Sequence, residues 1–96
     1  KFPNVQAEID FYEKKTVSQP QDISYLISLG FAYLKNDSYE KADSCFRKAV
    51  EPNIKNAEAY FGLGIIAFEN GKYEDAVNEY ENAVTIDSLN DNYFLN

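Results

Sequence analysis

A repeat with a period of 34 residues constrains the fold of this chain more than any other feature. When the sequence is shifted by 34 positions against itself, Gly30 aligns with Gly64 and Leu29 aligns with Leu63. Identical residues recur at seven more positions of the first copy, namely Asn36, Tyr39, Glu40, Ala42, Ala49, Val50 and Asn56. Such a period is typical of arrays in which each unit packs against its neighbours. The repeat therefore predicts two equivalent, stacked units.

Each unit has the pattern of two helices joined by a short polar turn. Four helices are expected, over residues 23–36, 39–51, 57–70 and 73–86. Asn70 and Gly71 form the turn of the second unit, where glycine favours the left-handed backbone that ends a helix. Pro52 and Asn53 close the first unit. Two antiparallel helices joined by two or three residues make a helical hairpin, so we expect an all-α chain.

Residues at fixed places in each unit resemble the tetratricopeptide repeat family. The matching residues are Leu26, Leu29, Gly30, Tyr33, Ala42, Phe46 and Ala49 in the first copy, and Tyr60, Leu63, Gly64, Ala67, Ala76, Tyr80 and Ala83 in the second. Three positions depart from the family pattern: Leu26 replaces its large aromatic, Ala67 replaces its tyrosine, and the late proline is displaced to Pro52 or replaced by Ser88. The resemblance covers about residues 23–90. It implies an α-solenoid of antiparallel helix hairpins with right-handed superhelical stacking.

The chain divides into four parts on this basis. Residues 1–22 carry an N-terminal helix that is the second helix of a partial repeat or a cap, 23–56 and 57–90 are the two repeats, and 91–96 begin a truncated following helix. Glu8 and Lys15 stand where the repeats place Ala42 and Ala49, and charged groups are disfavoured at a tight helix crossing. We therefore expect a lone amphipathic helix over 5–16, packed on the first repeat through Ile9, Tyr12 and Phe11.

A solenoid usually needs about three repeats and polar terminal caps, and this sequence has two repeats and fragments. Two readings stay open. Either the piece belongs to a longer array, or its open end pairs with a second copy and makes a homo-oligomer.

Small residues are predicted to set the crossing within each hairpin. Gly30 and Ala42 are expected to meet there, because small side chains let two helix backbones approach closely. Ala49 follows Ala42 by seven residues and lies on the same helix face. The full packing set is Leu29, Gly30, Ala42, Ala49, Leu63, Gly64, Ala76 and Ala83.

A second apolar stripe remains on the first helix of each repeat. In tetratricopeptide arrays the first helices line a concave groove, so the resemblance implies a peptide-binding floor of Ile27, Phe31, Leu34, Phe61, Ile65 and Phe68. Its rim would be Ser24, Lys35, Asn56, Glu58, Glu69 and Asn90. Neighbouring first helices could bury part of this strip, whereas an apolar patch of several hundred Å² left in water usually marks a binding site.

The charge distribution argues against a nucleic-acid partner. The net charge is −7, and residues 56–96 carry eight acids against Lys72 alone. Binding a phosphate backbone needs a basic surface. The acidic half is read either as a solvated face or as an attraction for a basic partner.

Candidate catalytic and metal sites are few. The chain has no histidine and one cysteine, which excludes a Cys-His or Ser-His nucleophile and argues against zinc. Residues 87–91 lack the spaced acids and central glycine of a calcium loop. The paired acids, such as Glu74 with Asp75, are expected in solvent, and Cys45 is expected to be packed or inert. We predict no enzyme activity, no cofactor and no metal.

The resulting hypothesis is a protein-binding scaffold that takes a peptide or helix in an apolar groove with an acidic rim. Its partner would be amphipathic, with basic flanks. The groove lacks the Lys, Asn and Arg with which some family members clamp acidic chaperone tails; Ile27, Phe31 and Phe61 stand at such positions. The alternatives are end-to-end self-assembly and regulation of an attached enzyme. No apolar run approaches the roughly 20 residues that cross a bilayer, so no membrane contact is expected. A soluble chain is expected, and although the sequence does not define its compartment, the cytoplasm is slightly favoured.

Overall fold

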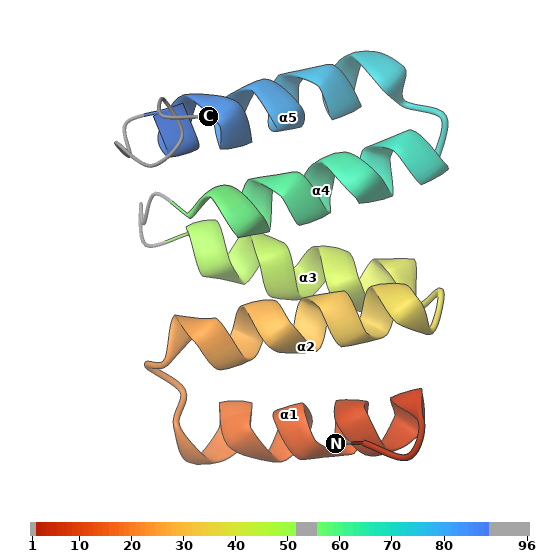
Figure 1. Ribbon diagram of the computed structural model, residues 1–96, viewed down its shortest axis with the longest axis vertical. Coiled ribbons are helices and arrows are strands. Elements are labelled where there is room, and N and C mark those ends of the chain that lie inside the picture. The colour runs from red at the N-terminus through yellow and green to blue at the C-terminus, as the bar shows by residue number, and fades with distance from the viewer. Residues whose placement is uncertain (1, 52–55, 89–96) are drawn as a thin grey trace.

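The computed structural model describes residues 2–51 and 56–88, which form five α-helices and no strand. These are α1 (Val5–Ser18), α2 (Ile23–Lys35), α3 (Tyr39–Val50), α4 (Ala57–Glu69) and α5 (Tyr73–Ser88). Each helix packs beside the next in the chain, so the helices form an antiparallel stack from α1 to α5 (Figure 1). The predicted all-α fold of stacked helical hairpins is confirmed.

Polar caps define where three of the helices begin. The side chains of Asn4, Asp22 and Asn56 accept hydrogen bonds from N–H groups in the first turns of α1, α2 and α4, at 2.9, 3.1 and 3.0 Å. The first N–H groups of a helix have no partner within it, and a cap of this kind typically contributes about 1 kcal/mol. The caps therefore fix the register at which each apolar stripe starts.

The two hairpin turns have the same backbone geometry. The N–H of Ser38 donates to the carbonyl of Tyr33 at 2.9 Å, and its counterpart Lys72 makes the equivalent bond at 2.8 Å. The residue before each donor lies in the left-handed region, with φ of 58° at Asp37 and 77° at Gly71. This is the Schellman termination of a helix, which glycine adopts without strain. The repeat in sequence is thus also a repeat in turn geometry.

The predicted boundaries agree with the helices to within two residues. The helices α2, α3 and α4 each end one residue earlier than predicted, and both α1 and α5 continue two residues further. Differences of this size are usual at helix ends, where the last turn frays.

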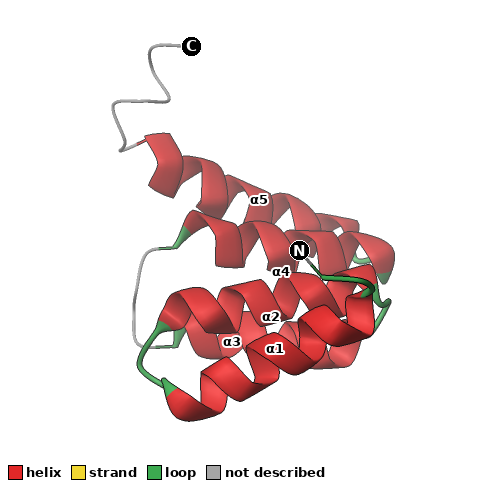
Figure 2. Ribbon diagram, turned by 60° about the horizontal axis from the view of Figure 1, so that its bottom comes forward, coloured by secondary structure: helices red, strands yellow, loops and turns green. Residues whose placement is uncertain are grey.

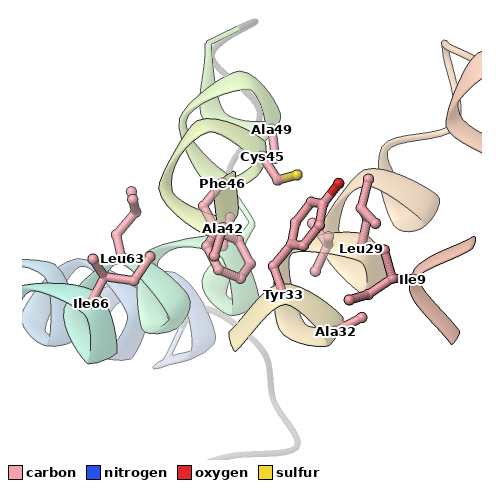
Figure 3. Close-up of a cluster of buried hydrophobic side chains, with 12 residues drawn as sticks. Ile9, Leu29, Ala32, Tyr33, Ala42, Cys45, Phe46, Ala49, Leu63 and Ile66 are labelled. Carbon is pink, nitrogen blue, oxygen red and sulfur yellow. The ribbon is translucent and has the colours of Figure 1, made fainter. Parts of the chain in front are cut away.

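One buried cluster connects the first four helices. Its members are Ile9, Ile27, Leu29, Ala32, Tyr33, Ala42, Cys45, Phe46, Ala49, Ala59, Leu63 and Ile66. Figure 3 shows the Phe46 ring at the centre of the cluster, with Leu63 and Ile66 on one side and Tyr33 on the other. Phe46 is the largest fully buried side chain of the described residues, at 0% exposure. The helix α3 therefore joins the two repeats through this ring.

Two glycines make the space that Phe46 occupies. A Cβ built on Gly30 would lie 2.7 Å from the ring, and one built on Gly62 would lie 2.4 Å from it. Non-bonded carbon atoms do not approach so closely, so a side chain at either position requires the Phe46 ring to shift. The closest side chain to a Cβ at Gly30 is thus the Phe46 ring, and the expected meeting of Gly30 with Ala42 stays a prediction. A helix crossing accommodates whichever side chain points into it, and here that side chain is the Phe46 ring. The second copy repeats the arrangement, because a Cβ on Gly64 would lie 2.5 Å from the Tyr80 ring.

The helix α1 packs on α2 through a mixed apolar and polar contact. Ile9 is buried, and Tyr12 packs against the core. The Tyr33 hydroxyl donates to Glu13 at 2.5 Å, and Glu8 pairs with Lys35 at 3.1 Å. Of the two charged residues expected to disfavour a tight crossing, Glu8 is thus paired with Lys35, and Lys15 lies over the rings of Phe11 and Tyr25. Phe11, by contrast, stays exposed and contacts Phe2 and Tyr12 rather than the first repeat. In Figure 2, as in Figure 1, α1 and α5 lie at opposite ends of the stack.

Candidate protein-binding surface

The predicted groove floor divides into a covered half and an open half. On α2, Ile27 is only 4% exposed and belongs to the core, while Phe31 and Leu34 are half-buried against it. The Phe31 ring lies 4.9 Å from the Phe46 ring and nearly perpendicular to it. Aromatic pairs favour this edge-to-face arrangement. The α2 half of the strip is therefore largely engaged within the protein.

The α4 half of the same strip is open to solvent. Phe61 is 49% exposed and Phe68 is 53% exposed, with Ile65 half-buried between them. Aromatic residues of α5 extend this half, because the Phe61 ring lies 5.6 Å from the Tyr80 ring and the Phe68 ring lies 5.3 Å from the Tyr73 ring. These contacts bring two apolar stripes together on neighbouring antiparallel helices.

We call this region the α4–α5 aromatic surface. It comprises Phe61, Ile65 and Phe68 of α4 and Tyr73, Val77 and Tyr80 of α5. The members on each helix follow one another at i, i+4 and i+7, which places them on one helix face. Tyr73 and Val77 are more than half exposed.

The register of the repeat explains why one half is covered and the other is open. Phe46 in the first repeat corresponds to Tyr80 in the second. The helix α4 covers the Phe46 ring, with Gly62 directly against it. No helix follows α5 in the described residues to cover Tyr80 in the same way. The α4–α5 aromatic surface is thus the counterpart of a surface that α4 covers one repeat earlier.

The helices that carry the α4–α5 aromatic surface also carry exposed acids. Glu58 and Glu69 are exposed at the two ends of α4, and Glu74 and Glu81 are exposed on α5. Other predicted rim residues have structural partners: Ser24 donates to the Asp22 carboxylate, Lys35 pairs with Glu8, and Asn56 caps α4. Asn90 lies outside the described residues. The rim is therefore acidic on the side of the second repeat.

Cys45 and Tyr33 are the buried titratable groups of the core. Burial raises the pKa of the Cys45 thiol to about 11, an effect that the nearby Lys48 ammonium partly opposes. Burial also raises the pKa of Tyr33, and the hydrogen bond to Glu13 raises it further. Both groups are held neutral near pH 7, so the Cys45 thiol is a poor nucleophile.

The remaining candidates do not assemble into a reactive site. Glu74 and Asp75 are exposed on the first turn of α5. Within residues 2–51 and 56–88, no three metal-ligating side chains cluster, and none of the helices there is long and apolar enough to cross a membrane. Residues 89–91 of the segment that lacks the features of a calcium loop lie outside the described residues.

Sequence reasoning missed the contribution of α5 to the open surface. The sequence places Tyr73, Val77 and Tyr80 in the expected helix over residues 73–86 and gives none of them a place in the predicted groove. Their exposure follows from the position of α5 at the end of the described stack, and only the i, i+4, i+7 spacing signalled it in the sequence. Gly62 was also missed, because its counterpart in the first repeat is Ser28 and the repeat pattern does not mark it.

Comparison with known families gives two matches, which together span about two thirds of the chain. The tetratricopeptide repeat matches residues 57–90 and again residues 23–51. These limits coincide with the two hairpins α4–α5 and α2–α3.

Several curated proteins have related sequences. Anaphase-promoting complex subunit 3 of Schizosaccharomyces pombe is 31% identical over 61 residues, covering 64% of this chain and 9% of that protein. Cilia- and flagella-associated protein 70 of Homo sapiens is 25% identical over 87 residues, covering 91% of this chain and 8% of that protein. Protein bimA of Emericella nidulans is 30% identical over 61 residues, covering 64% of this chain and 8% of that protein. The chain thus spans less than a tenth of the length of each of these relatives.

Proposed function

Because this chain belongs to the tetratricopeptide repeat family, we propose that it is a non-enzymatic interaction scaffold and that its α4–α5 aromatic surface binds an amphipathic helix with basic flanks. The observation that carries the proposal is the pair of half-exposed rings, Phe61 and Phe68, on one face of α4. Tyr73 and Tyr80 continue that face on α5.

The apolar character of this surface supplies a driving force for binding. Fully burying a large apolar side chain contributes roughly 1.5–3 kcal/mol. Phe61 and Phe68 are about half exposed, so covering each would contribute about 1 kcal/mol before the cost of ordering a partner. Tyr73 and Val77 add exposed area next to them. These contacts, with the apolar side chains that the partner buries in turn, favour binding of modest affinity.

The shape of the surface favours a helical partner. The two apolar stripes form one continuous face, because the Phe61 ring contacts the Tyr80 ring and the Phe68 ring contacts the Tyr73 ring. An amphipathic helix can lay its own i, i+3, i+4 and i+7 side chains on such a face. The same two helices carry exposed acids, Glu58 and Glu69 on α4 and Glu74 and Glu81 on α5. Lysine or arginine next to the apolar anchors of the partner would complement them and speed association.

The relatives are consistent with an assembly role. One of them is named as a subunit of the anaphase-promoting complex. We infer only the general class from this name, because the chain corresponds to less than a tenth of that protein.

A substitution at the centre of the surface tests the proposal. We expect Phe61→Glu to abolish binding of a fluorescent, Leu-anchored helical peptide with lysine flanks, measured by anisotropy, because it places a charge in the apolar contact. Val17→Glu on α1 is the matched control: it makes the same change in net charge at a side chain that is 80% exposed. Binding by Phe61→Glu as tight as that by the wild type would exclude the proposed surface. A large drop in melting temperature would instead mean that Phe61 belongs to the core.

End-to-end self-assembly is a second candidate, and a specific observation favours it. The α4–α5 aromatic surface corresponds to the α2–α3 surface that α4 covers, so a helix of a second copy could lie there. Sedimentation equilibrium from low to high micromolar concentration separates the two candidates. Growth in mass that Phe61→Glu suppresses would support self-assembly, whereas a strict monomer that binds the peptide would support the scaffold.

A further inference from the structure

A second groove lies among α1, α2 and α3, away from the α4–α5 aromatic surface. It has a volume of about 590 Å³ and is bounded by the C-terminal end of α1, one face of α2 and the outer side of α3. We propose that this groove, which we call the α1–α3 groove, binds an acidic amphipathic helix of a partner protein. The proposal does not depend on the function proposed for the aromatic surface.

The floor of the α1–α3 groove is apolar. Leu26, Leu29 and Tyr33 line it from α2, and Cys45 lines it from α3. Figure 3 shows Leu29, the Tyr33 hydroxyl and the Cys45 thiol on the same side of the core cluster. The Tyr33 hydroxyl already donates to Glu13, so it requires no further acceptor. The floor therefore offers apolar contact without an unpaired buried polar group.

Two lysines of α3 stand over this floor. Lys41 and Lys48 line the groove and are exposed. The Lys41 Nζ atom lies 5.7 Å from the centre of the Tyr33 ring, a favourable position for a cation above an aromatic face. Asp22 is the acid among the lining residues, and it accepts hydrogen bonds from the N–H and the hydroxyl of Ser24. The groove thus combines an apolar floor with a positively charged wall.

The lining of the corresponding groove in the next repeat is acidic on balance, with four acids against the two bases Arg47 and Lys72. This groove lies among α3, α4 and α5 and has a volume of about 410 Å³. By the 34-residue register, Asp75 replaces Lys41 and Glu79 replaces Cys45, and both acids line this second groove. The basic wall is therefore specific to the α1–α3 groove. In a chain of net charge −7, this difference selects an acidic partner for one groove and not for the other.

The spacing of the lysines suits a helix. Lys41 and Lys48 are seven residues apart, which is about 10 Å along the helix axis. A partner helix with carboxylates at i and i+7 presents its charges at the same spacing. Its i+3 and i+4 side chains lie between those charges on the same face, where they can contact Leu26 and Leu29. A nucleic acid is not favoured, since it requires a longer basic surface than two lysines provide.

A designed peptide serves as the probe. It is a helix with Glu at i and i+7 and Leu at i+3 and i+4, and two control peptides carry Gln for both Glu or Ala for both Leu. Isothermal titration with the complete chain is expected to show binding of the probe and weaker binding of both controls. Raising the salt concentration above 0.1 M should weaken binding of the probe, because exposed charges are screened over about 10 Å at that ionic strength.

Protein variants locate the site. Lys48→Glu is expected to raise the Kd of the probe roughly two- to five-fold, which is the range for the loss of one exposed ion pair. Lys14→Glu on α1 is the matched control, since Lys14 is also exposed and the change in net charge is the same. Two-dimensional ¹H–¹⁵N spectra should show shifts at Leu26, Ser44 and Lys48 and none at Phe61 or Phe68.

Three results would overturn the proposal. These are equal affinity of the Lys48→Glu and Lys14→Glu variants, shifts confined to α4 and α5, and absence of binding at millimolar peptide. Equal competition by a short single-stranded oligonucleotide would also contradict it, because it would show general attraction of anions. The melting curve of Lys48→Glu provides the folding control.

Discussion

Gly62 gives the sharpest test of how the two repeats are joined. A Cβ at this position would lie 2.4, 2.5 and 2.8 Å from three carbon atoms of the Phe46 ring. Carbon atoms without a bond between them normally sit 3.5–4.0 Å apart, so Gly62→Ala requires the ring to move by about 1 Å. Phe46 is fully buried, with Gly30 of α2 also against its ring and Phe31 at 4.9 Å. The ring therefore has no free space on its other sides.

Two opposing effects decide the size of the change. Overpacking a well-filled core typically costs about 1–3 kcal/mol. Replacing glycine by alanine within a helix contributes about 1 kcal/mol in the other direction. Because two helices confine the ring, we expect the steric cost to exceed the gain in helix propensity. Gly62→Ala should lower the free energy of unfolding by up to about 2 kcal/mol, which corresponds to a melting temperature lower by up to roughly 15 °C in a domain of this size.

Gly64 provides a matched control in the same helix. A Cβ built on Gly64 would lie 2.5 Å from the Tyr80 ring, close to the 2.4 Å between a Cβ on Gly62 and the Phe46 ring. Tyr80, however, is only partly buried and borders the open α4–α5 aromatic surface, so its ring can move outward. Gly64→Ala should therefore change the melting temperature less than Gly62→Ala. Both are measured by thermal and urea unfolding, followed by far-ultraviolet circular dichroism.

A double-mutant cycle isolates the contact with the ring. In a Phe46→Leu background the obstructing ring atoms are gone, so Gly62→Ala should become neutral or stabilising by up to about 1 kcal/mol. A change of sign between the two backgrounds is the expected signature. If Gly62→Ala stabilises the wild-type chain, the close approach of α4 to Phe46 does not exist and the reasoning fails.

The remaining predictions concern the second turn and the buried thiol. Gly71→Ala should lower the free energy of unfolding in urea by about 1 kcal/mol, because a φ of 77° strains a residue that has a Cβ; no nearby atom adds a steric clash. Asp37→Gly should instead raise the free energy of unfolding, because glycine adopts the φ of 58° at the equivalent turn without strain. Equal effects of the two substitutions would contradict the turn assignment. Burial raises the pKa of the Cys45 thiol to about 11 in the folded chain, so the thiol of the unfolded chain deprotonates at a lower pH. The free energy of unfolding should therefore fall as the pH rises from about 9 to 11. The fall should be smaller in the Cys45→Ala variant. At pH 8 the thiol of the folded chain should react with a disulfide reagent roughly a hundredfold more slowly than that of the urea-unfolded chain; equal rates would mean that Cys45 is not buried.

Most of the fold could be predicted from the sequence because the repeat marks its main packing positions twice. Leu29 and Leu63, Ala42 and Ala76 recur in register, and polar turn residues separate the helices. The position of the Phe46 ring against Gly30 could not be predicted in this way, because two residues of the facing helix, Ala42 and Phe46, are both compatible with helical spacing. Which of them points at Gly30 depends on the rotation of α3 about its axis.

The open surface was only partly predictable. Helical periodicity predicts that Phe61, Ile65 and Phe68 share one exposed helix face. The same periodicity predicts an exposed Ile27 at the equivalent position of the first repeat, and Ile27 is buried. Coverage by a neighbouring helix is a tertiary effect that acts at one repeat and not at the next. The packing of α5 against α4 places Tyr73 beside Phe68 and Tyr80 beside Phe61.

Direct mapping of the bound peptide tests the central claim that the α4–α5 aromatic surface is the binding site. The measurement is a titration of the ¹⁵N-labelled chain with the Leu-anchored, lysine-flanked helix, followed by ¹H–¹⁵N spectra. Amide shifts clustered around Phe61, Phe68 and Tyr73, with α1 unchanged, are the predicted result. Shifts centred on α2, or no shifts at saturating peptide, would contradict the account.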